Sequence, residues 1–322
     1  MSVKSSVIVL LAGLCLMTGP AFAAPLQKSE INPAAGWVVH ADLEAFRSSG
    51  VGKLVLEELK AQGIEQKMQE FATIFSFQPL TDLRDVTLYG TGTDRNNAVV
   101  IADGRFDAEK LLGIVRWNPQ YKEIPYEGVT LYQWLNEDKK NPAAEQIMYG
   151  YIHGGQQVVI SSGLDTLKHA VNTLKQPAGG PSTGLISRIP ALEKGAFLQV
   201  VATGIGDLAG QEPKAAILKQ ADSLTLSAGE AADKVFIGLQ VQGQTPEVAQ
   251  NIANLVQGVV AMAQLAAQEQ PKLSELAKNV NIAREDKTVR VRFEAASQSV
   301  FGFLKEQWQQ KQQSQPQPAT TP

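Results

Sequence analysis

Three side chains that can carry out acid–base chemistry lie close together early in the chain. His40, Asp42 and Glu44 occupy every second position in and just after an apolar segment. In an extended strand alternate side chains point to one face, so His40 and Asp42 share a face. A carboxylate beside an imidazole can orient it as a general base or share a metal ion with it. Two interpretations stay open: a catalytic pair formed by His40 and Asp42, or a polar strand end that faces solvent.

Other residues that could support catalysis or bind a cofactor stand in weak patterns. His153 and His169 lack the short spacing of a metal-binding pair. The serines at 161 and 162 precede a glycine but lack the Gly-x-Ser-x-Gly pattern of a nucleophile turn. The glycine-rich stretches lack the Lys-Ser/Thr of a phosphate loop. We therefore expect no cofactor and no metal, and an enzyme is the less favoured class.

The composition is that of a globular protein without a nucleic-acid partner. Of the 322 residues, 44% are hydrophobic and 19% are charged, which predicts a packed core and length enough for about two domains. The 29 Lys and Arg residues and the 32 Asp and Glu residues are spread along the chain. No basic block is present to neutralise a phosphate backbone, so we expect no nucleic acid among the partners.

Residues 1–23 have the pattern of an export signal. Lys4 precedes an apolar run over residues 7–17, and residues 21–23 form a small-x-small cleavage site, which predicts cleavage after Ala23. The run is shorter than the roughly 20 residues of a membrane-spanning helix, so we expect no transmembrane span in the mature chain. Cys15, the single cysteine, leaves with the signal, which excludes disulfides and thiolate chemistry. The predicted location is periplasmic or extracellular.

Hydrophobic periodicity and turn residues predict the same order of elements twice. The first half reads as a strand, a helical stretch broken by glycines, a hairpin, a helix, further strands and a closing helix, over residues 37–43, 44–75, 85–90, 98–102, 108–117, 129–135, 145–152, 157–161 and 166–175. The second half gives strands at 196–201, 222–227 and 234–241, a helix at 246–268, strands at 280–283 and 288–293, and a helix at 297–308.

This order predicts an α+β fold made of two tandem repeats of antiparallel sheet backed by helices on one face. The repeats cover residues 24–176 and 186–308, and a Pro- and Gly-rich linker covers 177–185. Residues 309–322 are rich in Gln and Pro and predict a disordered tail. Whether the repeats join edge to edge in one sheet or face each other stays open.

Several segments carry a resemblance to a group of known proteins. They are the export signal, the strand that opens Gly-Trp-Val-Val-His-Ala-Asp-Leu at Gly36, the Asp-Leu-Arg-Asp-Val-Thr-Leu-Tyr-Gly segment at Asp82, the Gly-Arg-Phe-Asp step at Gly104, and the Gln-Val-Val-Ile-Ser-Ser strand at Gln157. Together they resemble exported bacterial proteins of unknown function with duplicated α+β units. The resemblance implies an envelope or secreted location and carries over no site residues.

The predicted helix at 246–268 is apolar over most of its circumference. Such a helix is usually buried, which predicts a central core helix between the repeats. In the alternative interpretation Ile252, Val256 and Val259 line an apolar groove for a lipid, a peptide or a partner helix.

These patterns favour an exported, non-catalytic binding or interaction protein of the bacterial cell envelope. Its expected partner is a protein, a peptide or a lipid of the envelope. Two other classes stay open: a secreted hydrolase that uses His40 and Asp42, and a purely structural envelope protein.

Overall fold

A computed structural model of the chain describes residues 24–75, 77–137, 145–176, 184–204, 218–265 and 270–313. The predicted signal segment lies outside the described residues, as do positions 177–183 of the predicted linker and positions 314–322 of the predicted tail.

Strands and helices of the first half follow the predicted order closely. The predicted helical stretch at 44–75, expected to be broken by glycines, forms three successive helices. The strands are β1 (Trp37–Asp42), β2 (Leu83–Gly90), β3 (Ala98–Gly104), β4 (Lys122–Tyr126), β5 (Val129–Asn136), β6 (Gln146–His153) and β7 (Gln157–Ser161). The helices are η1 (Lys28–Glu30), α2 (Leu43–Ser48), α3 (Gly50–Ala61), α4 (Ile64–Phe75), α5 (Pro79–Asp82), η2 (Arg95–Asn97), α6 (Ala108–Val115) and α7 (Leu164–Lys175).

In the second half, the last helix continues for five residues into the segment assigned to the tail. The strands are β8 (Ala196–Thr203), β9 (Ala221–Ala231), β10 (Lys234–Gly243), β11 (Val280–Glu285) and β12 (Thr288–Ala296). The helices are α8 (Gly184–Arg188), η5 (Leu218–Gln220), α10 (Pro246–Leu265), α11 (Pro271–Ala277) and α12 (Ser297–Gln313).

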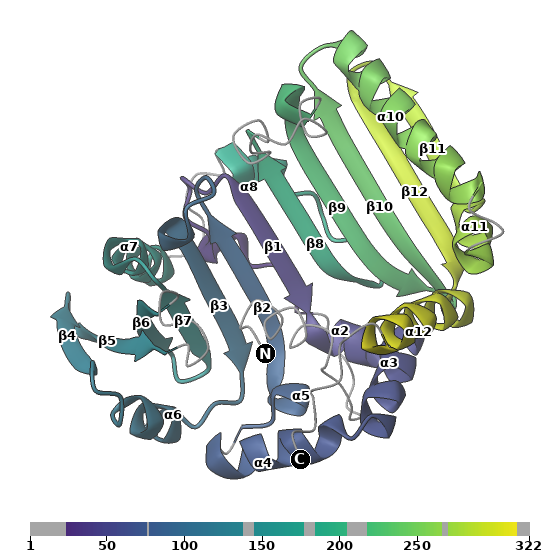
Figure 1. The fold of residues 1–322 in the computed structure, drawn as a ribbon. Helices are drawn as coiled ribbons and strands as arrows, with labels where there is room; N and C mark the ends of the chain where they lie inside the picture. The colour runs from purple at the N-terminus through teal and green to yellow at the C-terminus, as the bar shows by residue number, and fades with distance from the viewer. Residues whose placement is uncertain are drawn as a thin grey trace, which may run out of the picture.

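All of these strands belong to one twelve-stranded antiparallel sheet (Figure 1). Its order is β11-β12-β10-β9-β8-β1-β2-β3-β7-β6-β5-β4. The two halves meet where β1 pairs with β8, with Val39 opposite Val200. They therefore join edge to edge, which decides between the two arrangements that the sequence left open.

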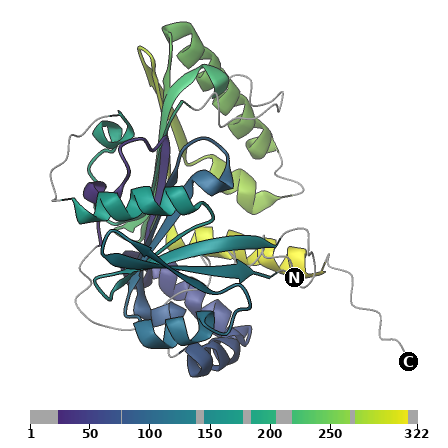
Figure 2. The same ribbon diagram turned by 90° about the vertical axis from the view of Figure 1, so that its left-hand side faces the viewer.

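The strand order is the same on both sides of the β1–β8 pair. Reading outward, the first half runs β1-β2-β3-β7-β6 and the second runs β8-β9-β10-β12-β11. The first half adds the hairpin of β5 and β4 at its edge. Figure 2 shows the sheet turned by 90°, with the strands of the β4 edge running across the direction of β1, as the normal twist of a sheet requires.

Strand β4 was not predicted from the sequence. Its segment Lys-Glu-Ile-Pro-Tyr shows no clean alternation and contains Pro125, which lacks a backbone donor. Proline is tolerated in strands at sheet edges, and β4 is the edge strand. The pairing partner, rather than the local pattern, makes this segment a strand.

Helices pack on both faces of the joined sheet, whereas the sequence predicts helices on one face of the sheet in each repeat. Leu167 and Val171 of α7 are buried in the same core as Val38 of β1. Ile252 of α10 is buried in a second core, against which Trp37 packs. Trp37 and Val38 are neighbours in one strand and point to opposite faces. The sheet must therefore be apolar on a different face in each half.

The two halves are also joined through the N-terminus of α3. The Glu230 carboxylate, on β9, accepts hydrogen bonds from the backbone nitrogens of Gly50 and Val51 at 2.9 and 2.6 Å. A Cβ at position 50 would lie 2.6 Å from Glu230 Oε1, so a larger residue there would require the carboxylate to shift. A carboxylate at a helix N-terminus is favoured by the free N–H groups and the helix dipole. Lys305 of α12 forms an ion pair of 2.6 Å with Glu58 of α3 on the same side of the fold.

Among the described helices, none is both long enough and apolar enough to cross a membrane.

Candidate functional site

His40 lies in the middle of β1 and is 2% exposed. Its Nε2 is 2.7 Å from the backbone oxygen of Ala24, and its Nδ1 is 2.9 Å from the hydroxyl of Thr87. Because a carbonyl oxygen can only accept, Nε2 carries the proton, and in the neutral ring Nδ1 accepts from Thr87. Burial lowers the pKa of His40 below its ordinary 6.5, which keeps the ring neutral.

Asp42 ends the same strand and is fully buried. Its Oδ1 accepts from the backbone nitrogen of Ala45 at 2.7 Å, which caps α2, and its Oδ2 accepts from the backbone nitrogen of Ala24 at 2.7 Å. Burial raises the pKa of Asp42, and the hydrogen bonds from Ala45 and Ala24 act against that rise. His40 thus binds the backbone oxygen of Ala24, and Asp42 binds the backbone nitrogen of the same residue.

The sequence correctly places His40 and Asp42 on one face, but the expectation of a strand end facing solvent is wrong. Both side chains lie beneath the segment that starts at Ala24. Both His40 nitrogens are engaged, and the ring does not bond to Asp42. The geometry is therefore suited to holding the chain rather than to taking a proton from a substrate.

A cavity of about 280 Å³ opens beside this pair and is strongly acidic. Its lining includes Ala24, Arg84 and four carboxylates, those of Glu30, Glu44, Asp85 and Asp103. Arg84 Nε donates to Asp103 at 2.6 Å, and the amide of Gln157 donates to Glu30 at 2.9 Å.

Among the carboxylates of this cavity, Asp85 is the one whose negative charge is least offset by its surroundings. It stands opposite Asp42 in the β1–β2 register, on the same face. Burial, and then the charges of Asp103, Glu30 and Asp42, raise the pKa of Asp85 from 3.8 to about 7. Like charges at opposed positions of a sheet destabilise it. The cavity therefore has an excess of negative charge.

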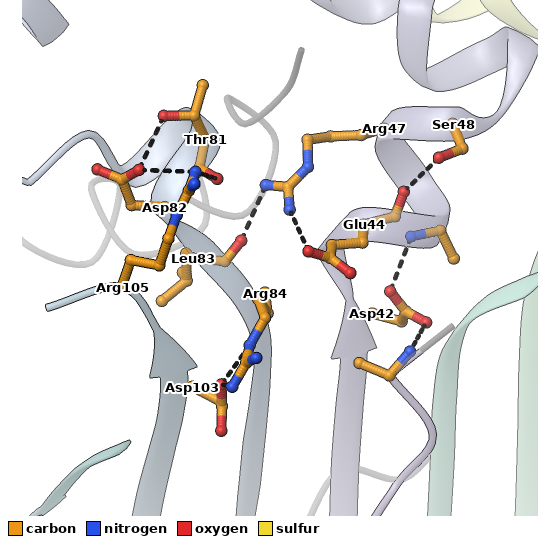
Figure 3. A network of polar contacts seen from close by, with 12 residues as sticks. Asp42, Glu44, Arg47, Ser48, Thr81, Asp82, Leu83, Arg84, Asp103 and Arg105 are labelled. Carbon is orange, nitrogen blue, oxygen red and sulfur yellow. Dashed lines mark hydrogen bonds and ion pairs between the residues drawn. The ribbon is translucent and has the colours of Figure 1, made fainter. Parts of the chain in front are cut away.

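Figure 3 shows how the nearby cations are placed. Arg47 is buried, donates to the backbone oxygen of Leu83 at 2.8 Å and lies 3.8 Å from Glu44. Arg84 points toward Asp103, and Arg105 lies 3.1 Å from Asp82. The same view shows Asp42 with its two backbone donors.

Helix α10 is not the central core helix that its composition predicts. Ile252 is 2% exposed, and Val256 packs half-buried against the same core, but Val259 is 53% exposed. The helix lies on the sheet over β10, β11 and β12 with one side open. Four large apolar side chains of that side are exposed: Leu255, Val259, Met262 and Leu265. We call these four residues the apolar stripe of α10.

The remaining candidates from the sequence have structural roles or stand apart. Ser161 is buried, donates to the backbone oxygen of Ala98 at 2.8 Å and accepts from the nitrogen of Gly163 at 3.1 Å. His153 contacts the hydroxyl of Tyr151 at 3.2 Å, and His169 is exposed on α7. Among the described residues, no group of three or more His, Cys, Asp and Glu side chains is placed to hold a metal ion.

Ala24 and Asp85 are the residues of this site that sequence reasoning missed. The sequence pattern predicts cleavage before Ala24 but gives no sign of where Ala24 docks. Asp85 was assigned to the correct strand, but its position opposite Asp42 depends on strand register, which hydrophobic periodicity does not supply.

Comparison with known proteins gives a distant structural likeness. No family model and no curated protein matches the chain. Two crystal forms of TP0453, III and I, share 9% identity with it at TM-scores of 0.47 and 0.45. Each alignment covers 88% of this chain, and 99% and 98% of the respective TP0453 chain.

Proposed function

We propose that this chain is an exported, non-catalytic interaction protein of the bacterial cell envelope, and that it binds a protein partner through the apolar stripe of α10. One observation carries the proposal: four large apolar side chains on one helix are between 46% and 84% exposed. A contiguous exposed apolar surface marks an interaction site more often than an isolated apolar residue does.

The spacing of the stripe suits a helix that lies in a groove of its partner. Leu255, Val259, Met262 and Leu265 stand at i, i+4, i+7 and i+10, which places them on one side of a helix. The exposed Gly258 lies beside them and allows close approach of another backbone.

The charge of the helix favours a protein over a membrane surface as the partner. Helices that bind membrane surfaces are usually rich in Lys and Arg on the polar face, and α10 contains neither. After cleavage at Ala23 the mature chain has a net charge of 28 − 32 = −4, because residues 1–23 contain one lysine and no acidic residue. Anionic lipids would repel such a chain. Protein interfaces, by contrast, are depleted of charge at their centres.

The environment of His40 and Asp42 supports a non-catalytic role. Their polar atoms are used within the protein, on Ala24, Ala45 and Thr87. A substrate would have to displace the segment at Ala24 to reach either residue.

The proposal includes a duplicated architecture, as the resemblance to exported proteins with duplicated α+β units implies. The common strand order outward from β1 and from β8 supports it.

The experiment compares two surface variants in cells that export the protein. Val259→Glu combined with Met262→Glu places charges in the apolar stripe. Gln257→Glu adds a charge at an exposed position on another side of the same helix and serves as the control. We expect the wild type and the control to elute from gel filtration of the envelope extract in a complex larger than the monomer, and the double variant to elute as a monomer.

Two results would contradict the proposal. One is an equal elution volume for all three proteins. The other is flotation of the purified wild type with phosphatidylglycerol vesicles that the double variant loses, which would make a membrane the partner.

A further inference from the structure

We propose that Asp42 and His40 form a built-in binding site for the amino terminus that cleavage after Ala23 creates. The new α-ammonium of Ala24 would form a buried ion pair with Asp42, and the maturation of the chain would thereby complete its fold. This inference rests on the export and cleavage part of the proposed function, and it is independent of the partner of α10.

The contacts that such a site needs are already in place. The nitrogen of Ala24, which becomes the terminal amine, is 2.7 Å from Asp42 Oδ2. This distance is typical of a charge-assisted N–H···O⁻ bond. The carbonyl of Ala24 accepts from His40 Nε2 at 2.7 Å. Both atoms of the residue that cleavage would expose are thus bound by buried side chains.

The segment that follows Ala24 is anchored so that the terminus stays in this position. Ile31 is 1% exposed within the core of the first half. Lys28 Nζ donates to the backbone oxygen of Ile189 at 2.7 Å, which links the segment to the second half. These contacts pre-organise the segment, so the terminus is held beside Asp42 and His40 without further ordering of the chain.

The charge of the surroundings favours an ammonium at Ala24. Asp42 and Asp85 stand opposite one another, and Glu30, Glu44 and Asp103 lie around the same cavity. Arg84 is the basic residue of that lining, and it is paired with Asp103. Before cleavage Ala24 contributes a neutral amide, and after cleavage it contributes a full positive charge, which offsets the carboxylate excess.

The covalent step is the hydrolysis of the Ala23–Ala24 peptide bond by a signal peptidase of the host. The C–N bond breaks and water is added. The hydroxyl goes to the carbonyl carbon of Ala23 and a proton to the nitrogen of Ala24. At neutral pH the acid proton moves to the amine, which leaves a carboxylate on Ala23 and an ammonium on Ala24. No oxidant or reductant takes part.

The test compares the exported protein with a variant whose terminus is displaced. Insertion of Gly-Ser between Ala23 and Ala24 keeps the small-x-small signal, and after cleavage it leaves Ala24 as an amide behind two new residues. Intact mass and amino-terminal sequencing establish where each chain begins. The melting temperature is then measured for both proteins, each with and without Asp42→Asn.

We expect the insertion to lower the melting temperature by about 2 to 6 °C. We also expect Asp42→Asn to abolish this difference, because the partner of the ammonium is then gone. Asp107→Asn is the matched control: Asp107 caps α6 by accepting from the nitrogen of Lys110 at 3.1 Å, as Asp42 caps α2. In the Asp107→Asn background the effect of the insertion should persist.

A second readout does not depend on the folding of the Asp42 variant. An ion-paired, partly buried amine should acylate at pH 8 about fivefold more slowly than the amine of the Gly-Ser variant, because a pKa rise of about one unit, as expected of a paired group, reduces the free-amine fraction at pH 8 by about that factor. If the mature chain begins at Ala24, equal melting temperatures together with equal acylation rates would overturn the inference. A chain that begins at another residue would overturn the predicted cleavage and the inference together, without bearing on the apolar stripe of α10.

Discussion

Single residues set the character of the β1 site. Periodicity alone places His40 and Asp42 on one face, because a strand alternates strictly. The partner of that face is Ala24, and no local pattern predicts it, since the contact joins residues 16 and 18 positions apart through the fold. The same residue types can therefore serve catalysis or hold the fold together. The burial of His40 and Asp42 distinguishes the second role from the first.

Replacement of His40 tests the buried role of the imidazole. His40→Ala removes the donor to the Ala24 carbonyl and leaves a cavity, so we expect the free energy of unfolding to fall by about 2 to 4 kcal/mol. Chemical denaturation measures it. His169→Ala, at an exposed position of α7, should change stability by less than about 0.5 kcal/mol. Equal effects of the two substitutions would contradict the buried role.

The same histidine predicts a dependence of stability on pH. Its pKa in the folded state is below the ordinary 6.5, so below about pH 6.5 the unfolded chain binds the proton that the folded chain excludes. The contribution to stability is present above pH 6.5 and is lost as the pH falls toward the lowered pKa. Urea midpoints between pH 5 and 8 should show this slope, and His40→Gln should reduce it.

The raised pKa of Asp85 predicts that stability changes with pH in the opposite direction when Ala24 is an amide. Its folded pKa of about 7 lies above 3.8, so its stabilising contribution is complete below pH 3.8 and is lost as the pH rises through 7. In the Gly-Ser variant, Asp85→Asn should raise stability at pH 8 by about 1 to 2 kcal/mol. Glu137→Gln, at an exposed carboxylate, should have no measurable effect. A loss of stability at pH 8 in the Asp85 variant would contradict the charge excess of the cavity.

Among the elements, α10 shows most clearly what a sequence pattern leaves open. Its apolar residues cover so much of the circumference that the pattern predicts a helix but not which side is buried. The sheet contacts decide: the side of Ile252 faces β10 to β12, and the side of Met262 stays open. The edge strand β4 is the complementary case, in which pairing overrides a weak strand signal.

One substitution on each side of α10 tests which side is buried, because the two should lower stability by different amounts. Ile252→Ala should cost about 2 to 4 kcal/mol because it leaves a cavity in a packed core. Met262→Ala should cost less than about 1 kcal/mol because that side chain is 65% exposed. Thermal or urea unfolding of both variants measures the difference. Equal costs would mean that the apolar stripe is covered within the protein.

At the scale of the whole molecule, most of the fold follows from patterns in the sequence, and the assembly of the sheet does not. The predicted strands and helices lie near their observed positions because alternation and helical periodicity are local. Edge-to-edge joining through β1 and β8 depends on two strands whose centres are about 160 residues apart in the chain, at Val39 and Val200. The burial of α7 and α10 on opposite faces likewise depends on the assembled sheet.

The joined sheet predicts that the first half does not form a stable unit by itself. Residues 24–176 lack β8 and would expose the edge of β1. They also lose Leu185, Ile186 and Val201 from the core. We expect the 24–176 fragment to aggregate or exchange its amide hydrogens rapidly, and the full chain to unfold in one cooperative step. A monomeric fragment with protected amides would contradict this prediction.

The central claim is that α10 presents a binding surface for a protein, and site-specific photocrosslinking in exporting cells tests it most directly. A photoreactive residue at position 262 reports on the apolar stripe, and one at position 257 reports on another exposed side of the same helix. The account predicts one discrete protein adduct from position 262 and none from position 257. No protein adduct from position 262, or the same adducts from both positions, would contradict it.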